Sequence, residues 1–251
     1  MRVNLSLLRR YRPELPASAR SACEVLEDVG IEVKRLQETP QGDVATLELL
    51  ADRGDHHCYA GIARELGGRF EVPPPLPPQE PLTPDGTTAP VVDAPTCLAF
   101  GVARCTLADG DGDGGRLPEE WAEALRLNDE HTGLLAVDAG NVVGREIGQP
   151  LHVYDADRLV GPLRVRLSEE GETARLLDGD EPVPIPAGLT VVADDEGIVA
   201  VAGVMGTRRA AVTESTRHLL VESALFDPVA VRRAARALHR DPGRRGVGVD
   251  A

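Results

Sequence analysis

The sequence predicts an α+β fold. Some segments carry apolar residues at helical spacing, as in Ser18–Val29, whereas others alternate as a half-buried strand does, as in Leu163–Leu167. These strands and short helices are mixed along the chain without a regular strand–helix–strand repeat. At 251 residues, the chain is long enough for one large domain or two small ones, with an ample core.

The first 71 residues predict a small α+β domain. Val3–Leu7 alternates as a short strand does. Ser18 is a helix-capping residue, and Gly30 ends the helix that follows it. The other elements expected here are the strands Ile31–Val33 and Leu47–Leu50 and the helix Tyr59–Leu66.

Residues 72–95 are rich in proline and predict a stiff, mostly extended linker. Residues 96–251 then form the larger α+β domain, in which Asp194–Gly197 predicts a turn between two paired strands. The elements expected in this domain are the strands Cys97–Leu107, Leu163–Leu167, Thr190–Ala193 and Gly197–Ala202, the helix Pro118–Leu127 and the partly helical segment Val137–Glu146.

The composition excludes several classes of partner. A net charge of −14 opposes binding of DNA, and RNA binding needs a local basic patch. Aromatic residues make up only 3% of the chain, which argues against base stacking. No run approaches the roughly 20 apolar residues of a membrane span, and the N-terminus lacks an apolar signal segment. Four cysteines without a CxxC pair indicate a cytoplasmic protein with reduced thiols, and we expect Cys97 and Cys105 to be buried.

The stretch Val199–Arg233 carries the features of a binding pocket. Its apolar strand ends in Gly203–Gly206 (GVMG), a tight glycine turn that brings backbone close to whatever lies above it. Glu222 stands inside a second apolar run, Leu219–Phe226, where an unpaired carboxylate is costly. Asp227-Pro228 then begins a helix rich in arginine.

Three segments carry a resemblance to a known family. They are Glu146–Asp155 (EIGQPLHVYD), Val201–Gly206 (VAGVMG) and Leu220–Pro228 (LVESALFDP). In order and spacing they resemble the editing domain of the bacterial phenylalanyl-tRNA synthetase beta subunit. Asp138–Asn141 stands in place of that family's Asp-x-Thr-Asn. Residues 1–70 are similar to the small N-terminal domain of the same subunit, with Asp52–Asp55 where the family has Asn-Arg-x-Asp.

The resemblance implies a truncated homologue. In the family, a tRNA-binding OB domain is inserted into the N-terminal domain, and here only Gln37–Thr46 occupies that place. The later parts of the subunit, which contact tRNA and the catalytic subunit, are not expected in this chain. Two departures lie beside the pocket: Thr207–Arg209 replaces a Gly-Glu pair, and Arg240 replaces a Thr.

The resemblance also implies a role for each site residue. His152 faces the aminoacyl ester or the terminal ribose, and Asn141 holds the attacking water or the amino group. Glu222 accepts the hydroxyl of a tyrosine side chain, and Gly206 lines the slot for its ring. The other residues expected at the substrate are Gly203, Met205, Gln149 and Pro150, and those expected at the tRNA acceptor end are Arg232, Arg233, Arg236, Arg240, Arg244 and Arg245.

Each of these residues also has an ordinary structural interpretation. His152 alone is typical of a structural histidine, and Glu222 of a solvated strand residue. Gly203 and Gly206 are consistent with turns that have no other role, and Asn141 with a helix cap. The arginines are typical of a solvated helix face as well.

One acidic motif fits a metal-binding formula. Asp109–Gly114 (DGDGDG) followed by Glu120 matches the calcium-loop pattern D-x-D-x-D-G-x5-E. However, Arg116 stands at the eighth position, which is usually apolar, and the preceding segment is predicted to be a strand. We therefore expect an acidic turn without a metal, and no other cofactor.

These observations lead to three hypotheses of function. The first is a freestanding editing-domain homologue that binds aminoacyl-tRNA and hydrolyses mischarged species in trans, such as tyrosine on the phenylalanine tRNA. The second is a catalytically inactive accessory protein for a synthetase or a tRNA-dependent biosynthetic pathway. The third is a piece of a synthetase assembly with a catalytic subunit as its partner. No segment resembles an ATP-binding core, so the chain is not expected to charge tRNA alone.

Overall fold

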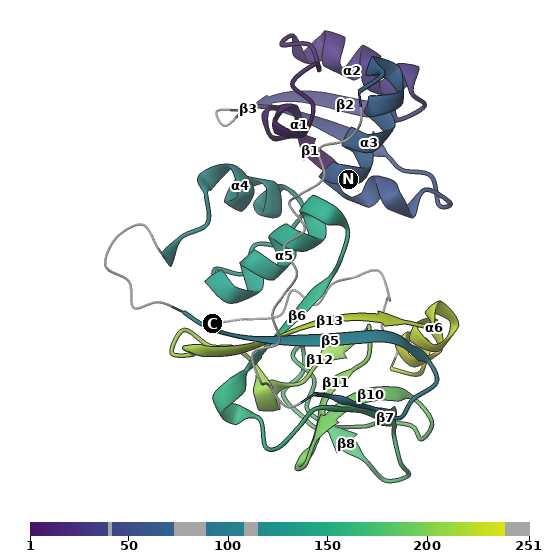
Figure 1. The fold of residues 1–251 in the computed structure, drawn as a ribbon, viewed down its shortest axis with the longest axis vertical. Helices are drawn as coiled ribbons and strands as arrows, with labels where there is room; N and C mark the ends of the chain where they lie inside the picture. Colours follow the sequence, from purple (N-terminus) through teal and green to yellow (C-terminus); the bar gives the residue numbers. More distant parts are fainter. Residues whose placement is uncertain (40–41, 73–88, 108–114, 239–251) are drawn as a thin grey trace. The chain divides into compact units, whose positions relative to one another are not determined.

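The structure is a computed structural model that describes residues 1–39, 42–72, 89–107 and 115–238 (Figure 1). Its contacts divide the chain into two units. The N-terminal unit comprises the described residues of Met1–Leu82, Leu117–His131 and Asn141–Gln149. The C-terminal unit comprises those of Thr83–Arg116, Thr132–Gly140 and Pro150–Ala251. Two segments expected within residues 96–251 therefore group with the N-terminal unit instead.

The N-terminal unit is a three-stranded antiparallel sheet packed against helices. The strand order is β1-β3-β2. One core joins the helices to the sheet. It contains Leu8, Leu26 and Ile62, each from a different helix, together with Leu47 of the sheet. The elements are β1 (Arg2–Asn4), α1 (Leu5–Tyr11), α2 (Ala19–Asp28), β2 (Glu32–Thr39), β3 (Gly42–Glu48), the 3-10 helix η1 (Gly54–His57), α3 (Tyr59–Phe70) and α4 (Glu119–Leu127).

One expected strand in this unit was wrong. The alternation of Val3–Leu7 predicted a strand, but β1 ends at Asn4 and a helix begins at Leu5. The reason is a helix cap, because the Asn4 side chain accepts hydrogen bonds from the backbone N–H groups of Ser6 and Leu7. The expected helix at Ser18 is confirmed, with Ser18 as its N-cap.

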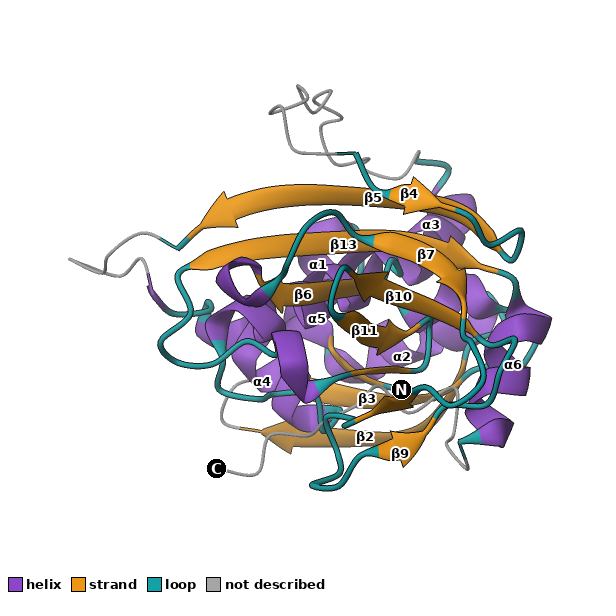
Figure 2. Cartoon of the chain, turned by 90° about the horizontal axis from the view of Figure 1, so that it is seen from below, coloured by secondary structure: helices purple, strands orange, loops and turns teal. Residues whose placement is uncertain are grey.

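The C-terminal unit packs two sheets face to face. A five-stranded sheet has the order β12-β11-β10-β7-β4, and a three-stranded sheet has the order β5-β13-β6. Figure 2 shows β5, β13 and β6 side by side. The strands of the C-terminal unit are β4 (Val91–Val92), β5 (Cys97–Thr106), β6 (Leu151–Asp155), β7 (Arg164–Leu167), β8 (Thr173–Ala174), β9 (Val183–Pro184), β10 (Thr190–Asp194), β11 (Gly197–Val201), β12 (Met205–Gly206) and β13 (His218–Phe226).

Alternation along the strands builds the core between these two sheets. Tyr154 and Leu220 of the three-stranded sheet share a buried cluster with Val165, Val192 and Val199 of the five-stranded sheet. The opposite face of the five-stranded sheet is covered by α6 (Pro228–Ala237) and the short β8–β9 pair, through a second cluster. The unit also contains the 3-10 helices η3 (Ala156–Arg158) and η4 (Arg208–Ala210) and the first part of α5 (Leu135–Ile147).

The local signals read from the sequence explain several of these elements. The turn Asp194–Gly197 joins β10 to β11, as expected. Asp227 caps α6 by accepting a hydrogen bond from the Ala230 N–H, and Pro228 is its first residue. The segment expected to be linker to residue 95 includes β4, which pairs in parallel with β7. The α+β class is confirmed, and no helix in the described part of the chain is long and apolar enough to cross a membrane.

Candidate ligand site on the three-stranded sheet

The central strand of the three-stranded sheet places the two most informative side chains directly opposite each other. In the antiparallel register of β13 and β6, Glu222 is the partner of His152. Partners in an antiparallel pair have their Cβ atoms about 5 Å apart and project them to the same face. Glu222 lies two residues after Leu220, so it faces the core between the two sheets, and its side chain is only 6% exposed.

The buried carboxylate has one partner. The Tyr154 hydroxyl donates a hydrogen bond to Glu222 Oε2 at 2.5 Å. The second oxygen, Oε1, has no hydrogen-bond partner among the described residues and is not sealed from solvent. Burial raises the pKa of Glu222 to about 7, and the bond from Tyr154 offsets part of that rise. No cation neutralises this carboxylate within the described part of the chain.

The His152 imidazole is half-buried and packs on the same tyrosine. The ring centroids of His152 and Tyr154 are 4.4 Å apart, and the rings are inclined at 69°. Neither ring nitrogen makes a hydrogen bond or an ion pair with another described residue. Burial lowers the pKa of His152 to about 4. The imidazole is therefore neutral at pH 7 and retains a nitrogen lone pair that can accept a proton or a hydrogen bond.

The glycine turn between β11 and β12 reaches this imidazole. Gly203 has a φ of +68°, a conformation that favours glycine, and a Cβ there would lie 2.9 Å from Val231. A Cβ on Gly206 would lie 2.6 Å from Cε1 and 2.9 Å from Nε2 of His152. The ring of His152 thus occupies the space that the missing side chain of Gly206 leaves. The half-buried Met205 belongs to the neighbouring core cluster on the five-stranded sheet.

The expected site residues are divided between the two units. Asn141 and Gln149 belong to the N-terminal unit, whereas Pro150 belongs to the C-terminal unit and is exposed. Asn141 lies inside α5 and is not a helix cap. Its side-chain amide donates a hydrogen bond to the Glu130 carbonyl at 2.9 Å. Its expected role at the ester remains a prediction.

The expected basic patch is partly described. Arg232, Arg233 and Arg236 lie on the exposed side of α6, while Ala234 and Ala235 are buried on the other side. None of the three arginines makes an ion pair with another residue in the described ranges. The other three members, Arg240, Arg244 and Arg245, lie outside the described residues.

Two further expectations concern the acidic motif and the cysteines. Asp109–Gly114 lies outside the described residues, and the carboxylate of Glu120 forms an ion pair with Arg10. Cys105 is exposed and Cys97 is half-buried, so the expectation of two buried thiols was wrong for Cys105. The reason is that β5 is an edge strand, so its residues are covered only from one side. Burial and the nearby Glu222 charge raise the pKa of Cys97.

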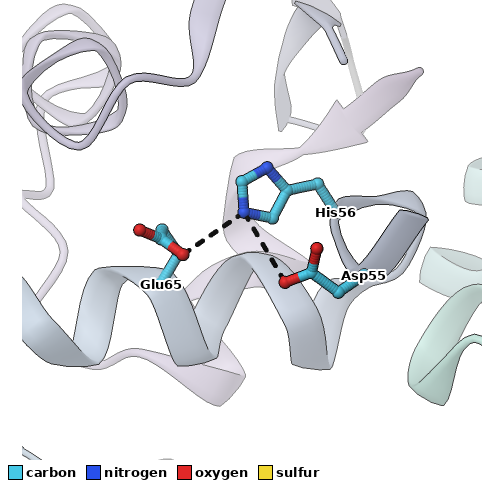
Figure 3. Close-up of side chains that lie close together, drawn as sticks. All are labelled: Asp55, His56 and Glu65. Carbon is cyan, nitrogen blue, oxygen red and sulfur yellow. Dashed lines mark hydrogen bonds and ion pairs between the residues drawn. The ribbon is translucent and has the colours of Figure 1, made fainter. Parts of the chain in front are cut away.

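A second group of titratable side chains, which the sequence did not single out, lies in the N-terminal unit. Asp55 and His56 of η1 and Glu65 of α3 place their potential metal-binding atoms within 4.8 Å of one another (Figure 3). His56 Nε2 lies 3.4 Å from a Glu65 oxygen and 3.9 Å from an Asp55 oxygen.

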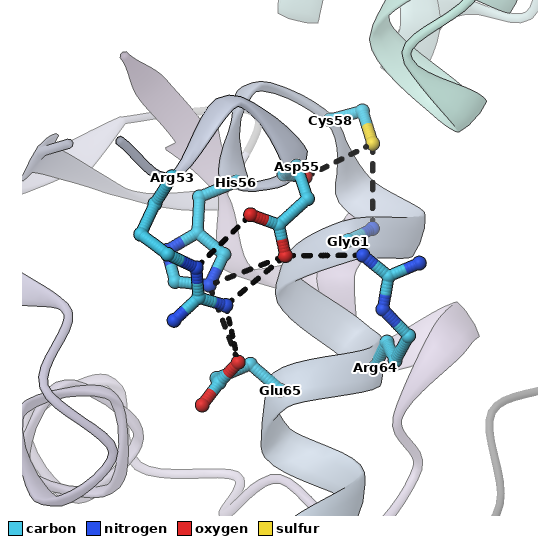
Figure 4. A network of polar contacts seen from close by, with 7 residues as sticks. All are labelled: Arg53, Asp55, His56, Cys58, Gly61, Arg64 and Glu65. Atoms are coloured by element: carbon cyan, nitrogen blue, oxygen red, sulfur yellow. Dashed lines mark hydrogen bonds and ion pairs between the residues drawn. The ribbon is translucent and has the colours of Figure 1, made fainter. Parts of the chain in front are cut away.

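Arginines already neutralise these carboxylates. Arg53 donates two hydrogen bonds to Asp55, each at 3.0 Å, and also contacts Glu65, while Arg64 donates to Asp55 at 3.0 Å (Figure 4). These contacts hold the pKa of Asp55 and of Glu65 below their usual range. The guanidinium of Arg53 therefore stands where a metal ion would otherwise be attracted, and the cluster is an ion-pair network.

A cavity of about 510 Å³ in the C-terminal unit is lined by neither His152 nor Glu222. It is mainly apolar, and its lining includes Ala237 of α6, Val183 of β9 and Ile185, which follows β9. Its lining includes the carboxylates Glu170 and Glu172 but no histidine, and Arg166 binds Glu172 at 2.6 Å. The chemistry of the sheet site is therefore the better guide to function.

Sequence comparison identifies the class of protein that this fold and site define. Residues 115–242, just over half of the chain, match the B3/4 domain family. The chain belongs to this family. The matched region contains the glycine turn, β6 with His152 and β13 with Glu222.

The chain is also similar to particular phenylalanine–tRNA ligase beta subunits. It is 32% identical to that of Psychrobacter arcticus over 245 residues, which covers 92% of this chain and 28% of the relative. It is 36% identical to that of Pseudomonas fluorescens strain Pf0-1 over 242 residues, again covering 92% and 28%. The chain thus spans little more than a quarter of the length of these relatives.

The fold has a solved counterpart. An N-terminal fragment of the phenylalanyl-tRNA synthetase beta subunit from Pyrococcus horikoshii superposes with a TM-score of 0.54, covering 95% of this chain and 73% of that chain. The two sequences are 15% identical, so the likeness concerns the fold alone.

Proposed function

We propose that this protein binds aminoacyl-tRNA and hydrolyses the ester of mischarged species in trans. The observation that carries the proposal is the pairing of His152 with Glu222 across β6 and β13, beside Gly206. In the synthetase beta subunits that the sequence resembles, the corresponding motifs belong to the editing domain. The relatives are phenylalanine–tRNA ligase beta subunits, and tyrosine on the phenylalanine tRNA is therefore the first substrate to test.

The chemistry of the pair suits a selective hydrolase. An aminoacyl ester is already activated, so positioning a water molecule and stabilising the oxyanion suffice without a covalent nucleophile. A neutral His152 can accept a hydrogen bond from that water, because burial keeps its pKa at about 4. Glu222 reads a side-chain hydroxyl, since a site built to bind a hydroxyl leaves a buried polar group unpaired when phenylalanine enters.

The arginines of α6 supply the charge needed for tRNA. Arg232, Arg233 and Arg236 are exposed and have no ion-pair partner in the described part of the chain. In a protein with a net charge of −14, such a patch is a natural contact for phosphates of an acceptor end. Replacing all three by glutamine is expected to weaken tRNA binding and to reduce its dependence on salt concentration.

Deacylation of a panel of mischarged tRNAs tests the proposal. The wild type is expected to release at least one amino acid, and His152→Ala and Glu222→Ala are expected to slow that release or broaden its selectivity. His218→Ala is the matched control, because His218 lies on the same strand β13 but is exposed and paired with Asp157 at 2.8 Å. Failure of the wild type to hydrolyse any member would refute the hydrolase.

A second candidate is a binding protein without hydrolytic activity. The His152 ring packs against Gly206, and the Tyr154 hydroxyl binds Glu222. These contacts favour a site without hydrolytic activity, because groups of the protein itself already contact both His152 and Glu222. The same panel separates the two functions. Tight binding of an aminoacyl-tRNA by the wild type, without release of the amino acid, would indicate the accessory role.

A further inference from the structure

Tyr154 touches both functional groups of the sheet site, the His152 imidazole and the Glu222 carboxyl group. Its ring packs on His152 with centroids 4.4 Å apart, and its hydroxyl donates to Glu222 Oε2 at 2.5 Å. Tyr154 is two residues from His152 on β6, so both project to the same face of the sheet. The side chain is 1% exposed, which fixes the direction in which its hydroxyl points.

The bond from Tyr154 divides the carboxyl group of Glu222 into two unequal oxygens. Oε2 is occupied by the protein, whereas Oε1 has no partner among the described residues and is not sealed from solvent. A carboxyl held at one oxygen cannot rotate freely, so Oε1 keeps one orientation. An unfilled hydrogen-bonding position of this kind at a buried carboxyl favours a ligand that supplies a hydroxyl.

We propose that Tyr154 is a positioning residue that sets the selectivity of this site, because its hydroxyl holds Glu222 Oε2 and leaves Oε1 to bind a hydroxyl group on the aminoacyl side chain of the ligand. The inference rests on the proposed function, in which Glu222 reads that side chain. It assigns the selectivity to the Tyr154–Glu222 pair and not to Glu222 alone.

The groups around Glu222 determine the pH at which it loses its proton. On the same face, β6 presents His152 and Tyr154, and Cys97 of β5 senses the Glu222 charge. The bond from Tyr154 is the contribution that lowers the pKa of Glu222 against the effect of burial. Removing the hydroxyl therefore moves the titration of Glu222 to higher pH.

Binding of two non-hydrolysable analogues tests this inference. Tyrosyl-adenosine and phenylalanyl-adenosine, each with an amide in place of the ester, are titrated calorimetrically into the full chain at several pH values. The wild type is expected to prefer the tyrosyl analogue by at least about tenfold, and Tyr154→Phe to lose most of that preference while still binding the phenylalanyl analogue. The midpoint of the pH dependence of the preference is expected to rise in Tyr154→Phe.

Two further variants separate positioning from packing. Tyr59→Phe removes the other deeply buried tyrosine hydroxyl, which accepts a hydrogen bond from the Asn4 N–H at 3.0 Å in the N-terminal unit, and is expected to leave the preference unchanged. Glu222→Gln keeps an acceptor for Tyr154 and is expected to abolish the pH dependence of the preference.

The outcomes distinguish the inference from the proposed function. An unchanged tyrosyl preference and midpoint in Tyr154→Phe, with both analogues bound by the wild type, would overturn the positioning role and leave the proposed function standing. Binding of neither analogue by the wild type would overturn the proposed function and the inference with it. Loss of the preference together with the rise in midpoint supports both.

Discussion

The Asp55–His56–Glu65 cluster and the His152–Glu222 pair differ in how their charge is compensated. In the N-terminal unit, Asp55 and Glu65 are partly exposed and Arg53 contacts both. In the C-terminal unit, Glu222 is buried, and among the described residues its hydrogen-bond partner is the hydroxyl of Tyr154. A satisfied ion-pair network stabilises local structure, whereas a buried carboxylate without a cation costs stability. A buried carboxylate of this kind is typical of functional sites, so the second cluster is the one at which we expect ligand binding.

The largest effect on stability should come from a backbone clash beside Asp55, His56 and Glu65. Because Arg53 binds both carboxylates, this group is called the arginine-clamped cluster below. A Cβ on Gly61 would lie 1.7 Å from the Asp55 carbonyl oxygen, so Gly61→Ala is expected to cost more than about 4 kcal/mol of unfolding free energy. Gly68→Ala, on the same helix with nothing within 4 Å of its Cβ, should be neutral or stabilising. Fluorescence of Trp121, the single tryptophan, reports urea unfolding of this unit. Equal stability of the two variants would contradict the packing described.

The next effect concerns the pH dependence of stability. Between pH 4.5 and 7 the folded chain keeps a proton on Glu222 that the unfolded chain has lost, so this group makes stability fall as pH rises. Between pH 4 and 6.5 the unfolded chain binds a proton at His152 that the folded chain does not, so this group makes stability rise with pH. Over their common range the two contributions oppose each other.

Single variants should separate the two slopes. As pH rises from 4.5 to 7.5, the unfolding free energy of Glu222→Gln is expected to increase relative to that of the wild type by up to about 3 kcal/mol. The reason is that each unit of pKa shift is worth about 1.4 kcal/mol. His152→Asn should leave a stability that falls with pH over the same interval. Urea denaturation followed by circular dichroism measures both. Parallel pH profiles for the wild type and Glu222→Gln would show that Glu222 is not a buried acid.

A smaller change at the glycine turn should affect ligand handling more than folding. Gly206→Ala places a Cβ 2.6 Å from the His152 ring and forces the imidazole to move, at a cost of about 1–3 kcal/mol. Deacylation, or binding of the aminoacyl-adenosine analogues, is expected to fall at least about tenfold. Gly179→Ala is the control, because an added Cβ there meets nothing within 4 Å. Equal activity of the two variants would remove His152 from the site.

The smallest expected effect is that of metal ions on the arginine-clamped cluster. Because Arg53 already neutralises Asp55 and Glu65, zinc or manganese should raise the melting temperature of the wild type by less than about 1 °C. Arg53→Met releases both carboxylates and is expected to lower the melting temperature slightly and to gain a response to zinc. Differential scanning fluorimetry with and without a chelator measures this, and a large zinc shift in the wild type would mean that the cluster is a metal site.

The sequence predicted the regular elements of the fold better than the pairings between them. Local signals found the helix capped by Ser18, the hairpin at Asp194–Gly197 and the start of α6 at Asp227. The alternation of Val3–Leu7 misled, because a single capping side chain, Asn4, turned the second half into helix. The two-residue strand β4 was missed, since it is too short to carry a period.

The candidate site was predicted only in part, because the pairing of its strands cannot be read from local sequence. The apolar flanks of Glu222 indicated burial, but the register that sets it against His152 depends on strands about 70 positions apart and cannot be read locally. The alternation expected along Leu151–Asp155 places Tyr154 on the same face of the strand as His152. This signal is sufficient to predict Tyr154 as a further residue of the site. The Arg53 network was missed because its partners come from η1 and α3.

We expect ligand to bind at the Glu222–Tyr154–His152 cluster and not at the arginine-clamped one. Nuclear magnetic resonance of the full chain with labelled histidine and glutamate tests it most directly, by titration with the tyrosyl-adenosine amide. The imidazole signals of His152 and the carboxyl signal of Glu222 are expected to shift, while those of His56 and Glu65 stay in place. Shifts confined to His56 and Glu65, or no shift at His152 on binding, would contradict it.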